Sequence, residues 1–316
     1  MNEALHVGVI GVGYLGRFHA RIYNDMPGVE LVGVVDTDRE TADRVAGEYD
    51  TRAYYDPTDL LDEVDVVSIV VPTSAHRQVA VPYLENGIHM LLEKPVASTL
   101  EDARAIVEAA RRHGATLQIG HLERFNAGIM ALANHVNEPR FIEAHRLGPF
   151  VERATDVDVV TDLMIHDIDI VLSLVGKKLT SISATGTPVL TDHVDIANAR
   201  LEFTNGAVAN VTASRVSSRK FRRIRVFGRN SYRAINFVDQ QLEVAYPGDI
   251  PDGQNFPEIV YETHNIIPSQ PLDAELDNFI DVVREGGDPL VSGEDGMEAL
   301  RVAMQVTDII KAGNSE

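Results

Sequence analysis

Three polar side chains stand where they could move a proton to or from an alcohol. Lys94 follows the apolar run 89–92, and Asp162 and His166 lie four residues apart in a helix-like segment. Residues at this spacing share one helical face, so the carboxylate could orient the imidazole and hold its charged form. A histidine suits general-base chemistry near neutral pH, and a lysine can hydrogen-bond a reacting hydroxyl. Each group also has a plainer interpretation. Lys94 could be a solvated loop lysine, and Asp162 could cap a helix beside a packed His166.

Three glycines form a second pattern, G-x-G-x-x-G, directly after the strand-like run 5–10. Gly11 permits a tight turn, Gly13 lets the backbone approach a pyrophosphate, and Gly16 lets the next helix pack closely. The start of that helix, with Tyr14 and Leu15 in the turn, offers N–H groups and a positive dipole end to phosphates. The order of strand, turn and helix predicts a dinucleotide site formed by these five residues.

An acidic residue, Asp36, ends the second strand-like run, 20 residues after Gly16. An acid at this point accepts hydrogen bonds from ribose hydroxyls and disfavours a 2′-phosphate, so the pattern predicts NAD rather than NADP as the cofactor. The alternative is a plain acid at the end of a strand.

Polar residues also follow two later strand-like runs. Pro72, Thr73 and His76 come after run 64–71, and Glu93 and Lys94 come after run 89–92. Ligands of parallel α/β sheets bind beyond the carboxyl ends of the strands. We therefore expect these five residues to line the cofactor cleft, with Glu93 orienting Lys94.

The elements that would position these groups alternate up to about residue 120. Strand-like runs cover 5–10, 30–35, 64–71, 89–92 and 115–119, and helical patterns cover 15–24, 38–47, 75–86 and 99–113. Such alternation predicts an α/β fold with a doubly wound parallel sheet.

The pattern changes after residue 121. Helical patterns cover 124–136, 162–175, 272–285 and 293–312. Alternating strand-like segments cover 179–188, 193–204, 207–216, 220–228 and 231–237. The Pro-rich stretch 247–271 is expected to be irregular. We therefore predict a dinucleotide domain over 1–121 and an α+β domain with an antiparallel sheet over 122–316, which would bind substrate and form oligomer contacts.

Composition excludes several classes of protein. The formal charge of −20 disfavours nucleic acid as a partner, and the absence of cysteine removes disulfides and thiolate chemistry. The scattered acids and histidines lack metal-ligand spacing, so we expect no metal. We also expect no membrane segment and no signal peptide, and hence a cytoplasmic protein. The 5 Lys against 23 Arg suggest the hypothesis of a halophilic source, because dense salt screens an acidic surface.

Taken in order, the motifs GVGYLG, Asp36, PTSAH, EKP and D-x-x-x-H resemble the Gfo/Idh/MocA family of sugar and cyclitol dehydrogenases. The resemblance covers nearly the whole chain. It implies a Rossmann domain followed by an α+β domain with an open, mostly antiparallel sheet, through which a homodimer or homotetramer would form. It also implies that Lys94 contacts the reacting hydroxyl, that His166 takes or gives its proton, and that Asp162 assists.

Three further segments, 121–126, 157–169 and 214–220, resemble the branch of this family that oxidises UDP-N-acetylglucosamine (UDP-GlcNAc) at C3. We expect Arg124, in the first of them, to contact the substrate together with Lys94, Asp162 and His166. The function expected is NAD-dependent oxidation of a secondary hydroxyl of a nucleotide sugar. Two alternatives stay open: an inositol or free-aldose dehydrogenase, and a non-catalytic NAD-binding regulatory protein.

A basic cluster gives a separate hint about the substrate. Six cations fall within 11 positions: Arg219, Lys220, Arg222, Arg223, Arg225 and Arg229. In an acidic protein such a cluster could bind a diphosphate, or it could pair with acids across a subunit interface. The sequence favours neither.

Overall fold

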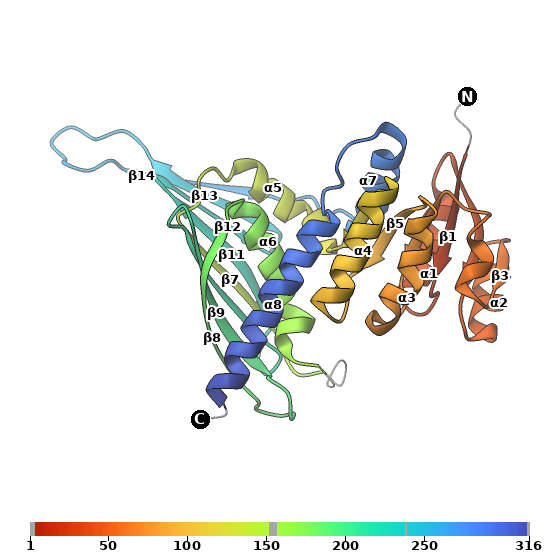
Figure 1. Ribbon diagram of the computed structural model, residues 1–316. Coiled ribbons are helices and arrows are strands. Elements are labelled where there is room, and N and C mark those ends of the chain that lie inside the picture. The colour runs from red at the N-terminus through yellow and green to blue at the C-terminus, as the bar shows by residue number, and fades with distance from the viewer. Residues whose placement is uncertain (1–3, 152–156, 238, 315–316) are drawn as a thin grey trace. The chain divides into compact units, whose positions relative to one another are not determined.

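The computed structural model describes residues 4–151, 157–237 and 239–314 (Figure 1). The chain divides into two compact units, which are described in turn. The first comprises Met1–Leu122 and Gln270–Leu300, and the second comprises Glu123–Ser269 and Arg301–Glu316.

A parallel six-stranded sheet forms the centre of the first unit, in the order β3-β2-β1-β4-β5-β6. Its strands are β1 (Leu5–Ile10), β2 (Val29–Val35), β3 (Arg52–Tyr54), β4 (Val66–Ile69), β5 (His89–Glu93) and β6 (Leu117–Gly120). Every neighbouring pair is parallel. The predicted doubly wound sheet is confirmed. Only β3 was missed, because three partly exposed residues carry no apolar periodicity.

Helices of the first unit lie within one or two residues of the predicted ranges. They are α1 (Gly16–Asp25), α2 (Arg39–Glu48), α3 (His76–Glu85), α4 (Leu100–His113) and α7 (Pro271–Glu285). One apolar core joins the sheet to α1, α2 and α7, and α7 contributes Leu276, Phe279 and Ile280 to it. Residues 270–300 therefore pack with the first unit, whereas we had expected the second domain to run without a break over 122–316.

An eight-stranded sheet forms the second unit, in the order β14-β13-β12-β11-β7-β10-β9-β8. Its strands are β7 (Phe141–Leu147), β8 (Leu179–Thr187), β9 (Ile196–Phe203), β10 (Val208–Ser214), β11 (Phe221–Gly228), β12 (Ser231–Asn236), β13 (Gln241–Pro247) and β14 (Ile259–Asn265). Only the β7–β10 pair is parallel, so the predicted mostly antiparallel sheet is confirmed. The expectation that 247–271 is irregular was wrong for 259–265. That strand has almost no buried residue to reveal it.

Helices cover one face of this second sheet. Figure 1 shows α5 (Ala127–His135) and α6 (Ile165–Val175) over it, α5 near β12 and β13 and α6 near β7 and β10. A π-helical turn, Val160–Met164, leads directly into α6. The last helix, α8 (Gly293–Asn314), contributes residues up to Leu300 to the first unit and later residues to the second. No helix among the described residues is long and apolar enough to cross a membrane.

Candidate functional site

The glycine turn after β1 has the geometry that its sequence predicts. Gly11 has φ +85°, and a Cβ there would lie 2.6 Å from the carbonyl oxygen of Val70. A Cβ on Gly16 would lie 1.8 Å from the carbonyl oxygen of Gly11, so α1 can begin this close to the turn only with glycine. Gly13 instead faces open space, with no atom within 4 Å of its Cβ position. The turn thus leaves room for a ligand where its backbone is exposed.

Asp36 is fixed beside this turn. Its Oδ2 accepts a 3.0 Å hydrogen bond from the amide of Val12, and its Oδ1 accepts one of 3.0 Å from the amide of Asp38. The carboxylate lines a cavity of about 330 Å³, whose walls also include Gly11, Gly13 and Pro72. This volume lies in the range of small-molecule sites. The residues present therefore fit a dinucleotide, with an acid where a ribose would lie.

The other residues predicted for the cofactor differ in exposure. Tyr14 is 78% exposed at the turn, while Leu15 and Thr73 are half-buried. His76 is buried, with Nε2 3.0 Å from the carbonyl oxygen of Val71 and Nδ1 3.3 Å from that of Val96. Burial lowers the pKa of His76, so its neutral ring can donate to only one of these carbonyls. The ring braces the loops that follow β4 and β5.

Glu93 points into the first unit from the end of β5. Its Oε1 lies 3.3 Å from Nε2 of the fully buried His19, whose Nδ1 lies 3.2 Å from Oγ of Ser68. The Ser68 hydroxyl in turn lies 2.9 Å from that of Tyr23. Lys94 follows half-buried in the next loop. Sequence reasoning missed His19 and Tyr23, although their spacing of four on a predicted helix was a usable signal.

A second acid, Glu275 on α7, belongs to this buried cluster. Its side chain is fully buried, and its backbone carbonyl accepts a 3.1 Å hydrogen bond from Nε2 of Gln118. Burial, with a smaller contribution from the charge of Glu93, raises the pKa of Glu275 well above its ordinary value of 4.5. The first unit therefore holds a buried carboxyl near Glu93 whose environment favours the protonated form, and no sequence motif indicated it.

Asp162 and His166 lie at the start of the helix predicted over 162–175. Asp162 belongs to the π-helical turn and His166 to the first turn of α6, and both are half-buried. Oδ1 of Asp158 accepts hydrogen bonds of 3.0 Å from the amides of Val160 and Thr161. Asp158, rather than Asp162, is therefore the capping residue. Single π-helical turns are frequent at functional sites.

Arginines hold the two acids that follow His166. Both Oδ atoms of Asp167 accept hydrogen bonds from Arg146, over 2.8 and 3.0 Å, and Arg146 also donates to Glu123 over 2.9 Å. Arg124, which we predicted as a substrate contact, lies 3.5 Å from the buried Asp169. Arg124 thus has a partner on α6, and its proposed substrate contact would have to be made in addition.

The basic cluster of 219–229 splits into paired and exposed members. Three ion pairs join it to acids of the same unit: Arg222 with Glu123, Arg223 with Glu243, and Arg225 with Glu143. These three arginines pair with nearby acids of the same unit, an arrangement that neither sequence interpretation had foreseen. Arg219 and Lys220 are exposed, and no ion pair joins them to any residue that the structure describes.

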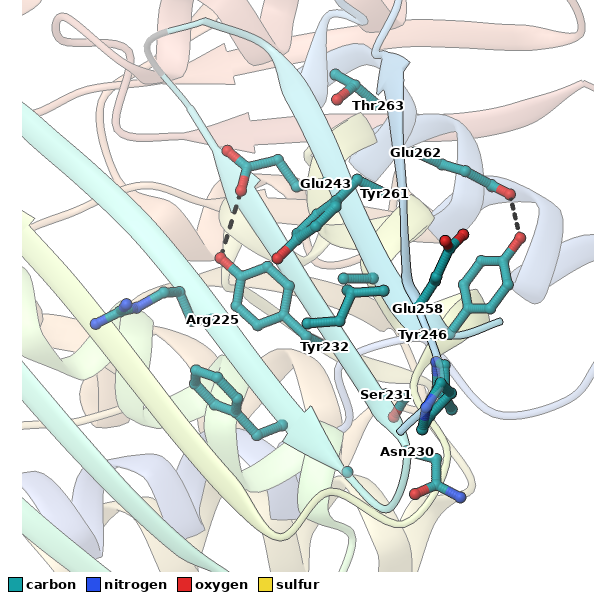
Figure 2. Close-up of a pocket in the computed structure, with 16 residues that line it drawn as sticks. Arg225, Asn230, Ser231, Tyr232, Glu243, Tyr246, Glu258, Tyr261, Glu262 and Thr263 are labelled. Atoms are coloured by element: carbon teal, nitrogen blue, oxygen red, sulfur yellow. Dashed lines mark hydrogen bonds between the residues drawn. The ribbon is translucent and has the colours of Figure 1, made fainter. Parts of the chain in front are cut away.

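A second cavity, of about 790 Å³, lies on the face of the second sheet that α5 and α6 do not cover (Figure 2). Tyr232, Tyr246 and Tyr261 line it; Tyr246 donates a 2.6 Å hydrogen bond to Glu262. None of the residues predicted for catalysis lines this cavity. Across the described residues, no group of three or more His, Cys, Asp or Glu side chains could hold a metal ion.

Comparison with known proteins covers both units. A model of an oxidoreductase family with an NAD-binding Rossmann fold matches residues 5–121, and the Gfo/Idh/MocA C-terminal domain model matches residues 117–232. A UDP-N-acetylglucosamine 3-dehydrogenase from Acidithiobacillus ferrooxidans is 37% identical over 311 residues, covering 98% of each chain. Its solved structure superposes with a TM-score of 0.91, covering 98% of this chain and 99% of that one.

Two more distant relatives are named as dehydrogenases of scyllo-inositol, a cyclitol. A scyllo-inositol 2-dehydrogenase (NAD(+)) from Bacillus subtilis is 28% identical over 339 residues, covering 99% of this chain and 96% of its own. A scyllo-inositol dehydrogenase from Lactobacillus casei, solved with NAD(H) and scyllo-inositol, shares the fold at a TM-score of 0.82 and 19% identity, with 98% of each chain covered. The glycine turn, Asp36 and the full-length match together show that this chain belongs to the Gfo/Idh/MocA family of NAD-binding oxidoreductases.

Proposed function

We propose that this protein is a cytoplasmic NAD-dependent dehydrogenase that oxidises a secondary hydroxyl of a nucleotide sugar, namely C3 of UDP-GlcNAc. The observation that carries this proposal is 37% identity over 98% of the chain to an enzyme of that name. The segments that suggested this substrate from the sequence are 121–126, 157–169 and 214–220. They lie almost entirely in the second unit, which we expect to bind the substrate.

The first unit would hold the cofactor. The turn from Gly11 to Gly16 would receive the pyrophosphate, and Asp36 would accept hydrogen bonds from the ribose. We extend the contact to Tyr14, Leu15, Pro72, Thr73 and Glu93, as the sequence suggested, while His76 would act through the two loops that it braces. NAD supplies the hydride acceptor when bound, and the protein supplies position and proton handling.

Proton handling is assigned to three residues. Lys94 would donate a hydrogen bond to the oxygen of the reacting hydroxyl, which favours its negative charge as the proton leaves. His166 would take that proton, and the carboxylate of Asp162 would stabilise the imidazolium that forms. Arg124 would bind the sugar. In the reverse direction the same groups would return the proton to a carbonyl oxygen.

The diphosphate contact is proposed at Arg219 and Lys220. The other members of the basic cluster near them are paired with acids, whereas these two cations are exposed in the segment that follows β10. Replacing each with alanine should raise the KM for UDP-GlcNAc roughly tenfold with little change in kcat. Arg229→Ala is the matched control, because Arg229 is exposed in the β11–β12 turn.

One assay separates the three functions. NADH formation is followed with UDP-GlcNAc, free GlcNAc, a free aldose and myo-inositol, for wild type, Lys94→Met and His166→Asn. We expect turnover of UDP-GlcNAc and losses of about 10²–10⁴-fold in kcat for both variants, with NAD binding retained. Lys177→Met and His135→Asn, at exposed positions, should stay active. Turnover of inositol or free aldose alone favours the first alternative, which the 28% identical inositol relative supports. NAD binding without turnover favours the regulatory alternative.

We propose further that the uncovered face of the second sheet joins copies of this chain into a dimer or tetramer. It exposes Tyr261 and Ile259, an apolar surface of the kind found at subunit contacts. Sedimentation velocity should give an oligomer, and Tyr261→Glu should weaken it. A wild-type monomer would refute this part alone.

A further inference from the structure

Arg215 and Asp195 form a buried ion pair in the second unit. Their residues are 5% and 0% exposed, and Nε of Arg215 lies 2.7 Å from Oδ1 of Asp195. Arg215 belongs to segment 214–220, in which the proposed function gives a role to Arg219 and Lys220 but none to Arg215. Burying two charges costs several kcal/mol per ion before their attraction is counted. A protein in which apolar residues of similar size replace such a pair is often at least as stable. The pair is therefore expected to serve geometry more than stability.

Asp195 organises the loop that joins β8 to β9. Its Oδ2 accepts hydrogen bonds from the amides of Val189, Leu190 and Thr191, over 2.8, 2.6 and 2.9 Å. Burial opposes ionisation, but these amides and Arg215 together hold the pKa of Asp195 below its ordinary value. A charged carboxylate thus fixes the loop in one conformation.

The guanidinium of Arg215 extends this order to the segment that precedes Asp162. Nη1 donates to the carbonyl oxygen of Val157 over 2.9 Å, and Nη2 donates to Oγ1 of Thr191 over 3.1 Å. The amide of Val159 also donates to the carbonyl of Val194 over 2.9 Å. Three donors of one planar group therefore join the β8–β9 loop, at Asp195 and Thr191, to the separate segment at Val157, a pattern that only arginine can supply.

These contacts lie directly before the residues assigned to proton transfer. Val157 precedes the π-helical turn that contains Asp162, and that turn runs without a break into α6 and His166. A shift at Val157 would pass to both side chains through this rigid element. A misplacement of about 1 Å at a reacting group can cost roughly 10²-fold in rate.

We propose that Arg215, held by Asp195, is a positioning residue that fixes the π-helical turn and thereby Asp162 and His166 for proton transfer. This inference rests on the proposed function. It assigns a role to Arg215 without any contact to substrate or cofactor.

Kinetics of Arg215→Lys test the proposal, because lysine keeps the charge but cannot reach all three partners. We expect kcat to fall about 10–100-fold with an unchanged Kd for NAD. The primary isotope effect with C3-deuterated UDP-GlcNAc should rise, since misplaced groups slow the chemical step. Guanidinium ion should partly restore kcat in Arg215→Ala. Arg200→Lys is the matched control: Arg200 pairs with Glu202 over 3.0 Å on the same sheet, but both are well exposed.

A merely structural role gives a different result. Rate would then fall only in proportion to the folded fraction, with an unchanged isotope effect and no rescue by guanidinium, and the proposal would be overturned. Amide hydrogen exchange of the peptide 157–166 provides a readout that needs no turnover. Faster exchange there in Arg215→Lys, but not in Arg200→Lys, supports the proposal even if wild type proves inactive on UDP-GlcNAc. In that case unchanged exchange refutes it, while the inactivity refutes the proposed function separately.

Discussion

The backbone amide of Val12 donates a 3.0 Å hydrogen bond to Oδ2 of Asp36, which joins the glycine turn to the acid at the end of β2. With Asp38 donating to Oδ1, the carboxylate is held by two amides before any ligand arrives. A preorganised acceptor loses little conformational freedom on binding. Nearly all of the free energy of its hydrogen bonds to a ribose should therefore contribute to affinity. The same fixed charge should repel a 2′-phosphate.

Replacing Asp36 with alanine tests this arrangement. Losing charge-assisted hydrogen bonds of about 1.5–3 kcal/mol should raise the Kd for NAD roughly 10–100-fold and reduce the preference over NADP. Binding is measured by titration with NADH and NADPH. Asp38→Asn is the control, because the Asp38 side chain bonds Thr41 at the surface. Tighter binding of NADPH than NADH by wild type would contradict the role given to Asp36.

Gly120 on β6 leaves space for the carboxyl group of Glu93. A Cβ there would lie 2.8 Å from Oε2 and 2.9 Å from the carboxyl carbon. Gly120→Ala should therefore push Glu93 away from His19 and lower the free energy of unfolding by about 1–3 kcal/mol, measured with urea. Gly47→Ala, on α2 with no atom near its Cβ position, should be neutral or slightly stabilising. Equal effects of the two substitutions would show that Glu93 is not confined as described.

Glu275 should make stability depend on pH in an unusual direction. Its folded pKa is raised above the unfolded value, so its favourable contribution is complete below about pH 4.5 and declines as pH rises toward the folded pKa. The decline amounts to about 1.4 kcal/mol for each pH unit in that window. Glu275→Gln should be more stable than wild type at pH 8 and similar at pH 4, as measured by urea unfolding. A difference in stability that does not depend on pH would contradict a raised pKa of Glu275.

The helices and strands that could be predicted from the sequence are those with a clear pattern of apolar residues. Apart from β3, the strands of the first sheet are apolar runs such as VVSIVV, and helices α4 and α7 have clear polar and apolar faces, so these elements were found to within a few residues. The failures have weak patterns. Strand β7, central in the second sheet, mixes Glu143, His145 and Arg146 with apolar residues, because Glu143 and Arg146 have charged partners in the fold. Strand β14 is exposed at every residue except the half-buried Val260.

The candidate site divides in the same way. Gly11, Gly16 and Asp36 could be predicted because each meets a local backbone requirement of one turn. His19, Ser68 and Glu275 could not, because the contacts of His19 with Ser68 and Glu93, and the burial of Glu275 near Glu93, depend on which strands and helices share a face. The role of Arg215 likewise depends on three segments that only the folded chain brings together.

The acidic composition predicts a dependence on salt. With a net charge of −20, repulsion between surface acids should destabilise the folded protein at low ionic strength, and salt should relieve it. We expect the urea midpoint to rise between about 0.1 M and about 3 M KCl. Equal stability at both concentrations would contradict the hypothesis of a halophilic source.

The ion pair of Arg146 with Glu123 should make stability depend on pH in the opposite direction to Glu275. Arg146 pairs with Asp167 and Glu123; although burial opposes the charge of Glu123, the attraction of Arg146 and Arg222 keeps the pKa of that carboxyl below its ordinary value. Such a group contributes stability above the unfolded pKa near 4.5 and loses it as pH falls through the lower folded value. Arg146→Met leaves buried carboxylates short of a cation and should cost about 3–5 kcal/mol at pH 7, measured by urea unfolding. The deficit should shrink toward pH 4, where the Glu123 carboxyl takes up a proton, while Arg200→Met should change little at either pH. A deficit that stays constant would mean that Arg146 acts through packing alone.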